Sequence, residues 1–207
     1  MGFQQSYRPD NRPSFTREPI LDQLDRGAPG FKKFMESHSG CSFNNGIYRV
    51  HSVSEIKKWT ACCHDAFPSF KGRTYTFASD WLGRQFGLDF NRTEAGQWQV
   101  LLFDPVEDES YEIPAGFQEF HDRELVASAD AALAIGKYRD WIESGGNVPQ
   151  VHECVGYKKP LALGGKDEVA NMEITDMEVH WSVLGQINAQ VRNLPPGTRI
   201  SGIRISD

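Results

Sequence analysis

Three consecutive segments with β-strand character, separated by short turns, constrain the fold of this chain most. They span residues 73–78, 82–89 and 97–103. Polar and apolar residues alternate at positions 74–77, and an apolar run fills positions 100–103, as expected for strands with one buried face. Turn signals at 80–81 and 91–96 separate the segments, and residues 110–113 can add a fourth short strand. This spacing predicts an antiparallel β-meander.

Helical patterns lie on both sides of these strands. The predicted helices span residues 54–66 with Ser54 as N-cap, a short stretch that begins at Pro114, residues 129–144 closed by Gly145-Gly146, and residues 177–192 with Asp176 as N-cap. A group of strands placed between groups of helices predicts the α+β class. We expect an antiparallel β-meander sheet packed with helices on one face.

The N-terminal part differs from the rest of the chain in its composition. Residues 1–19 are polar and contain three prolines, so we expect an arm outside the core. Two short helices are predicted within residues 20–35, and a turn at 44–46 leads into a strand-like segment. We therefore divide the chain into an N-terminal arm and short helical segment, residues 1–46, and an α+β domain, residues 47–207.

The last third contains fewer regular patterns. Residues 147–175 are rich in glycine and proline, which predicts irregular chain with one short strand at 160–163. Residues 198–205 follow a Pro-Pro-Gly sequence and are expected to return as an edge strand.

The charge balance limits the kinds of partner. The chain of 207 residues has a formal net charge of -6, which argues against direct nucleic-acid binding and is compatible with a basic protein partner. No apolar run is long enough to span a bilayer, and residues 1–17 lack the apolar core of a secretory signal. We expect a cytoplasmic protein that does not bind membranes.

The cysteines give little support for catalysis or metal binding. Cys41, Cys62, Cys63 and Cys154 form no CxxC pair, so we expect free thiols, no metal, no cofactor and no catalytic residues. A small metal- or thiol-dependent hydrolase remains as an alternative. It would use Cys154 with His152 or His121 as its base.

Two groups of acidic residues are candidates for a partner-binding surface. They are Asp104, Glu107, Asp108, Glu109 and Glu112, and, around the last predicted helix, Glu173, Asp176 and Glu178. Crowded carboxylates must be solvated or paired with a cation from outside, so the groups could dock on basic residues of a partner. Trp81, at a predicted corner, and Arg84 are the expected anchors, because exposed tryptophan and arginine are favoured at binding hot spots.

Several motifs in order carry a resemblance to a known family. They are the stretches FNNGIYRVH at 43–51, DWLGRQF at 80–86, CVGYKKPL at 154–161 and NMEITDMEVHW at 171–181. The chain resembles the type VI secretion immunity family that pairs a GAD-like N-terminal segment with a C-terminal domain once of unknown function. The resemblance spans residues 47–192, and residues 1–46 are similar to a shortened GAD-like segment.

The resemblance implies an immunity protein rather than an enzyme. Such a protein would bind a cognate DNase toxin stoichiometrically in the cytoplasm and protect the producing bacterium. The resemblance brings no catalytic residues with it. A regulatory module that docks on another basic protein remains as a further alternative.

Overall fold

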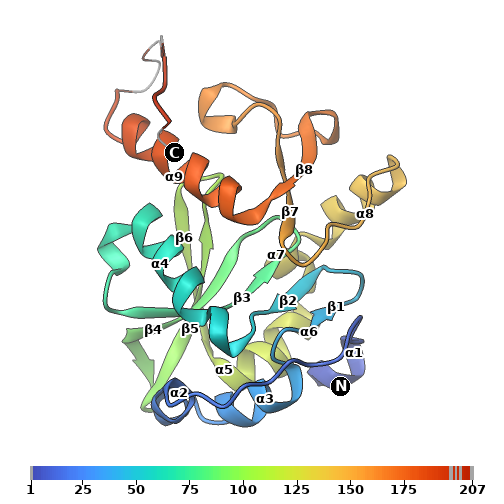
Figure 1. Ribbon diagram of the computed structural model, residues 1–207, viewed down its shortest axis with the longest axis vertical. Coiled ribbons are helices and arrows are strands. Elements are labelled where there is room, and N and C mark those ends of the chain that lie inside the picture. Colours follow the sequence, from blue (N-terminus) through green and yellow to red (C-terminus); the bar gives the residue numbers. More distant parts are fainter. Residues whose placement is uncertain (1, 196–197, 199, 201, 206–207) are drawn as a thin grey trace.

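The computed structural model describes residues 2–195, 198, 200 and 202–205. Within them, six strands form an antiparallel sheet in which each strand pairs with the next along the chain (Figure 1). The strands are β1 (Ser42–Phe43), β2 (Tyr48–Val50), β3 (Thr74–Asp80), β4 (Gln85–Glu94), β5 (Gln97–Asp104) and β6 (Glu109–Gly116). The predicted α+β class and the antiparallel meander are confirmed.

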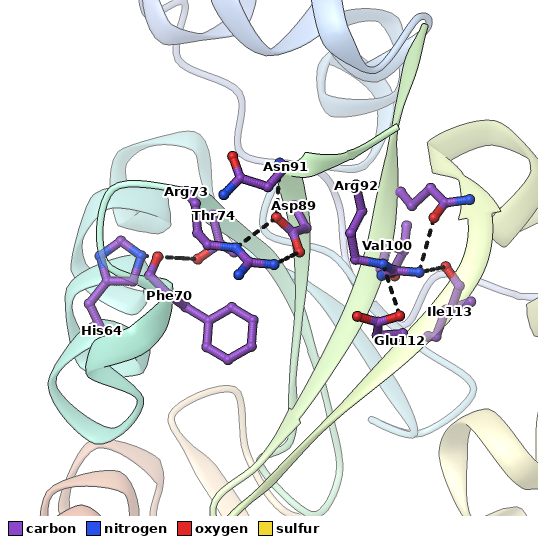
Figure 2. Close-up of polar contacts among 11 residues, drawn as sticks. His64, Phe70, Arg73, Thr74, Asp89, Asn91, Arg92, Val100, Glu112 and Ile113 are labelled. Atoms are coloured by element: carbon purple, nitrogen blue, oxygen red, sulfur yellow. Dashed lines mark hydrogen bonds and ion pairs between the residues drawn. The ribbon is translucent and has the colours of Figure 1, made fainter. Parts of the chain in front are cut away.

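The sheet is irregular where β4 passes β5. The register between the two strands shifts between Asp89 and Thr93, and two arginines hold this region (Figure 2). Arg73 pairs with Asp89 at 2.5 Å, and Arg92 donates to the carbonyl of Val100 at 3.0 Å. Most of the predicted turn at 91–96 is therefore strand, because side chains satisfy the backbone at the bulge.

Helices cover both faces of the sheet. The α-helices are α1 (Phe3–Ser6), α2 (Ile20–Gly27), α3 (Phe31–His38), α4 (Ile56–Ala66), α5 (Phe117–Glu119), α6 (Leu125–Ala127), α7 (Ala129–Leu133), α8 (Ile135–Glu143) and α9 (Met177–Val191). Phe86 and Leu102 pack with the helices α2, α3 and α5, whereas Leu101 and Phe103 pack with α4 and α9. Because side chains alternate along β5, they contribute to two hydrophobic cores, one on each face of the sheet. Helices therefore cover both faces and not only the one face that was expected.

A second, two-stranded sheet lies beside α9. It pairs β7 (Glu153–Tyr157) with β8 (Met172–Asp176) in antiparallel register, Glu153 opposite Asp176. Sequence analysis placed irregular chain here and a strand at 160–163, where the structure has a 3₁₀-helix, Leu161–Leu163. That prediction was wrong because β7 and β8 stabilise each other by pairing across the chain segment that separates them. A pairing between distant segments leaves no local pattern in the sequence.

The beginning of the predicted N-terminal arm is part of the core, whereas residues 8–17 are exposed. Phe3 and Tyr7 are buried, and the hydroxyl of Tyr7 donates to the carbonyl of Leu125 at 2.6 Å. Leu21 and Phe31 share a hydrophobic core with strands of the main sheet. The expectation of an arm outside the core was therefore wrong for Phe3 and Tyr7, whose aromatic rings gain free energy from burial, and was confirmed for the exposed residues 8–17. The division at residue 46 stays a proposal.

Three further boundaries differ from expectation. Ser54 lies in a 3₁₀-helix, Val53–Glu55, which leads into α4. Pro114 lies inside β6, and the next helix begins at Phe117. The predicted helix at 129–144 is two helices, divided at Ala134 with a φ of 50°.

Residues 198, 200 and 202–205 are not in a strand, and the remainder of the strand predicted at 198–205 lies outside the described residues.

The described part of the chain contains no candidate for a membrane-spanning helix. None of the helices there has both the length and the apolar character needed to cross a bilayer.

Candidate partner-binding surface

The first acidic group lies on the loop that joins β5 to β6, which we call the acidic loop (residues 104–109). One carboxylate oxygen of Asp104 accepts hydrogen bonds from the backbone N–H groups of Val106 and Glu107, at 2.9 and 3.2 Å. The backbone of Asp108 is left-handed, with a φ of 57°. The local sequence Asp-Pro therefore builds a tight turn that turns Glu107 outward.

The acidic loop is fastened to the C-terminal half of α9. The side-chain amide of Asn188 donates to the carbonyl of Pro105 at 2.7 Å, and Arg192 forms an ion pair with Asp108 at 2.5 Å. These contacts bring the loop next to α9, although the two are about 80 residues apart in sequence. Figure 1 shows this end of β6 beneath α9.

The carboxylates of this group differ in what they can offer a partner. Asp104 is only 7 % exposed, and burial raises its pKa to about 6. Glu107, Glu109 and Glu112 are exposed. Glu107 accepts a hydrogen bond from the hydroxyl of Tyr111, which raises the pKa of that tyrosine to about 12. Asp104 thus shapes the turn, and the glutamates form the surface.

Two members of the group are partly neutralised by arginines. Asp108 is paired with Arg192, as described above. Glu112 lies 3.3 Å from Nε of Arg92, the arginine that also holds the bulge of the sheet (Figure 2). A screened surface pair of this kind contributes little to stability, so Glu112 remains available to a partner at low cost.

The second acidic group divides in the same way. Asp176 caps α9 by accepting hydrogen bonds from the backbone N–H groups of Glu178 and Val179, at 2.9 and 3.0 Å, as predicted. Glu178 forms an ion pair with Lys58 of α4 at 2.6 Å. Glu173 is exposed on β8, and no cation lies within ion-pair distance of it among the described residues.

Of the two expected anchors, Trp81 is buried and Arg84 is mostly covered. Trp81 is 0 % exposed and donates its indole N–H to the carbonyl of Leu133 at 2.9 Å. The guanidinium of Arg84 pairs with Asp80 at 2.6 Å and donates to the carbonyl of Ala132. The expectation that Trp81 is exposed was wrong, because α7 and β7 cover the corner between β3 and β4. Trp81 therefore cannot reach a partner in this conformation, and the guanidinium of Arg84 is held by contacts within the chain.

Sequence reasoning missed a groove beside the acidic loop. The groove has a volume of about 250 Å³ and lies between β7, β8 and α9, with Val106 of the acidic loop at its edge. Its lining includes Glu173 of β8 and, on α9, Val179, His180, Val183 and Leu184. Spacing along α9 could have indicated an apolar face, but the opposing wall is the sheet β7–β8, which was not predicted.

The thiol alternative finds no support in the geometry. Cys154 is buried, and desolvation raises the pKa of its thiol, whereas a nucleophilic cysteine needs a lowered pKa. His152, by contrast, is exposed. Within the described residues, no three histidine, cysteine or acidic side chains come together in a way that could hold a metal ion. The surface is therefore better equipped for recognition by charge and shape than for bond making.

The fold and the site together define the class: an α+β protein with an acidic surface and an apolar groove. Residues 115–188 match the family described as "T6SS immunity protein Tdi1, C-terminal". Over these residues the chain is similar to the type VI secretion immunity proteins, which supports the family named by its sequence motifs. The match does not reach residues 1–46, so their GAD-like character stays a prediction.

A solved structure shares the fold. The crystal structure of Atu4351 from Agrobacterium tumefaciens is similar with a TM-score of 0.61 at 13 % sequence identity, over 88 % of this chain and 86 % of that chain. No curated protein matches the chain.

The matched region and the groove coincide. Apart from Val106, every residue that lines the groove lies between Gly156 and Leu184, inside the matched residues 115–188. The acidic loop lies just before that region.

Proposed function

We propose that this protein is an immunity protein that binds and inhibits a cognate type VI secreted nuclease toxin in the cytoplasm, by stoichiometric protein–protein interaction. The family match of residues 115–188 is the observation that carries the proposal. The formal net charge of -6 supports a nuclease as the target, because a protein that binds the phosphate backbone presents a basic surface. An acidic partner can cover such a surface and compete with the nucleic acid.

The contact surface that we propose differs from the one expected from sequence. Its centre is Glu107 and Glu109 of the acidic loop together with Glu173, which are exposed and have no ion-pair partner among the described residues. Asp108, Glu112 and Glu178 lie around this centre and exchange their own arginine or lysine partners for those of the toxin. Asp104, Trp81 and Arg84 support the surface from beneath without touching the toxin, and the exposed Asp176 serves as the cap of α9.

Co-expression with the product of the neighbouring gene tests the proposal directly. We expect that product to be toxic alone, to co-purify with this protein in a fixed ratio, and to lose its nuclease activity in the complex. A neighbour that degrades DNA equally well with and without this protein would contradict the proposal.

Charge reversal in the acidic loop tests the surface. We expect the double variant Glu107→Lys/Glu109→Lys to bind the toxin at least tenfold more weakly at about 50 mM salt, and the deficit to shrink at about 500 mM, because salt screens exposed charges. Calorimetric titration at the two salt concentrations measures both effects.

The matched control is Glu36→Lys/Glu143→Lys, which makes the same change in net charge on exposed positions of α3 and α8. Equal losses for the two double variants would show that overall charge, and not the acidic loop, attracts the toxin.

A further inference from the structure

We propose that the groove between β7, β8 and α9 receives one long cationic side chain, an arginine or a lysine, of the cognate toxin. The identity of the partner rests on the proposed function. The chemistry of the guest rests on the groove itself, which combines an apolar floor, carboxylates at the rim and one unsatisfied buried nitrogen.

The apolar floor comes from α9. Val179 is 55 % exposed at the first turn of the helix, and Val183 and Leu184 continue the same wall one turn further on. Uncovered valine at the mouth of a groove favours a guest with an aliphatic stem. Arginine and lysine have such stems of three and four methylene groups.

Carboxylates lie at and near the rim of the groove. Glu173 lines the groove and has no ion-pair partner among the described residues. Tyr157, also in the lining, has its pKa raised by burial and by Asp167, with further contributions from Asp104 and Glu107. Carboxylates of both acidic groups therefore contribute to the charge at the groove.

The lysine that belongs to the lining does not pair with Glu173. Lys158 lines the groove, but its ammonium group donates to the carbonyl of Ala170 at 3.0 Å. Asp167, which accepts a hydrogen bond from Tyr157, has its own cation in Lys137 at 2.5 Å. A guest cation therefore finds Glu173 free to pair with it.

His180 supplies the second observation that points to a guest. Its ring lines the groove and is only 7 % exposed, yet its Nε2 has no hydrogen-bond partner. The ring packs against the main chain at Gly156, where a Cβ atom would lie 2.8 Å from Nδ1. Burial lowers the pKa of His180 to about 4, so the ring is neutral at physiological pH. With the proton on Nδ1, the neutral ring offers Nε2 as an acceptor, and this tautomer favours a guest that carries N–H donors over an apolar one.

The size of the groove fits one long side chain. Pockets for small molecules usually measure about 300–1,000 Å³. The groove, at about 250 Å³, lies just below this range.

A titration with small probes tests the chemistry without the toxin. We expect N-acetyl-arginine amide to cause saturable chemical-shift changes at Val179, Val183 and His180, with binding in the millimolar range. The uncharged N-acetyl-norleucine amide, which has a stem of similar length, should bind at least fivefold more weakly. The variant Glu173→Gln should weaken binding of the arginine probe at least threefold. Equal binding of the two probes, or no binding of either, overturns the inference.

A blocked groove tests its part in the complex. Val179→Trp fills the mouth of the groove from an exposed position, and we expect at least a tenfold loss of affinity for the toxin. Ala189→Trp is the matched control, because it places the same ring on an exposed position of α9 outside the lining. Thermal melting of both variants checks that they fold.

The outcomes separate the inference from the proposed function. If the two tryptophan variants bind the toxin equally well, the inference fails and the immunity function stands. If the wild-type protein does not bind or inhibit the toxin while the arginine probe still binds the groove, the immunity function fails and the cation specificity of the groove stands.

Discussion

At the scale of single residues, the environment of a side chain decides its role more than its type does. Trp81 was the expected anchor, and it lies in a small core with Tyr138 and Val155. Its ring meets that of Tyr138 edge-on, with the centroids 5.1 Å apart. The large side chains that do face solvent beside the acidic surface include Val179 and Tyr111. We therefore propose that the hot-spot contacts of this surface lie at the groove and the acidic loop and not at the corner.

Substitution of Trp81 separates a core role from a contact role. We expect Trp81→Ala to lower the free energy of unfolding by about 3–5 kcal/mol, because it empties a buried site. Trp81→Phe should cost less, since it keeps most of the ring and removes the hydrogen bond to Leu133. Urea denaturation measures both values. A folded Trp81→Ala protein of wild-type stability that no longer binds the toxin would restore Trp81 as an anchor.

At the scale of elements, α7 and α8 show how a continuous helical pattern is broken. Ala134 lies between them in the left-handed region, with a φ of 50°, and its N–H donates to the carbonyl of Asp130 at 2.8 Å. The carboxylate of Asp130 then accepts a hydrogen bond from the N–H of Gly136 at 2.6 Å. The break turns α8 so that Tyr138 and Trp141 pack on the core that holds Trp81.

A glycine at position 134 tests this break. A left-handed alanine costs about 1 kcal/mol relative to glycine, so we expect Ala134→Gly to raise the free energy of unfolding by about 0.5–1 kcal/mol. Ala131→Gly, inside α7 and exposed, should lower it by about 1 kcal/mol, as glycine does in a helix interior. Chemical denaturation of both variants gives the comparison. If Ala134→Gly is destabilised like Ala131→Gly, the chain has one helix here, as the sequence pattern predicted.

At the scale of the whole molecule, three buried neutral histidines join the packed layers. His121 donates from Nδ1 to the carbonyl of Phe117 and accepts at Nε2 from the hydroxyl of Tyr48, which fixes its neutral form. His51 stacks on Trp59, and His180 lies under β7. Burial lowers the pKa values to about 3 for His121 and about 4 for His51 and His180.

These shifts predict a loss of stability in mild acid. Between pH 6.5 and pH 4 the unfolded chain binds protons that the folded protein does not, so stability falls as the pH falls. At pH 5 each histidine contributes about 2 kcal/mol to the loss. Asp104 acts in the opposite direction, because its raised pKa of about 6 makes the folded protein bind a proton first, and it offsets about 1 kcal/mol. We expect the free energy of unfolding to be about 5 kcal/mol lower at pH 5 than at pH 7.5.

Urea denaturation at the two pH values measures the effect. The variant Asp104→Asn, which keeps the oxygen acceptor of the turn, should lose about 1 kcal/mol more than the wild type over this range, because the opposing group is gone. A free energy of unfolding that does not change between pH 7.5 and pH 5 would show that these histidines become protonated without opening the fold.

Sequence reasoning succeeded where the information is local. The alternation at 74–77, the apolar run at 100–103 and Asp176 before α9 each predicted an element that the structure contains. The exposure of Glu107, Glu109 and Glu173 also follows from local charge. Backbone preference and side-chain period act over a few residues, so one sequence suffices to determine them.

Only the tertiary structure decided the groove and the fate of the expected anchors. The strand β7 is completed by β8, Trp81 is covered by α7 and β7, and the acidic loop reaches α9 through Asn188. Each of these contacts joins residues far apart in the chain, and its free energy comes from packing that no local pattern encodes. The sequence by itself determined the strands of the meander, the helix capped by Asp176 and the exposed carboxylates of this protein, whereas burial determined which of its side chains a partner can meet.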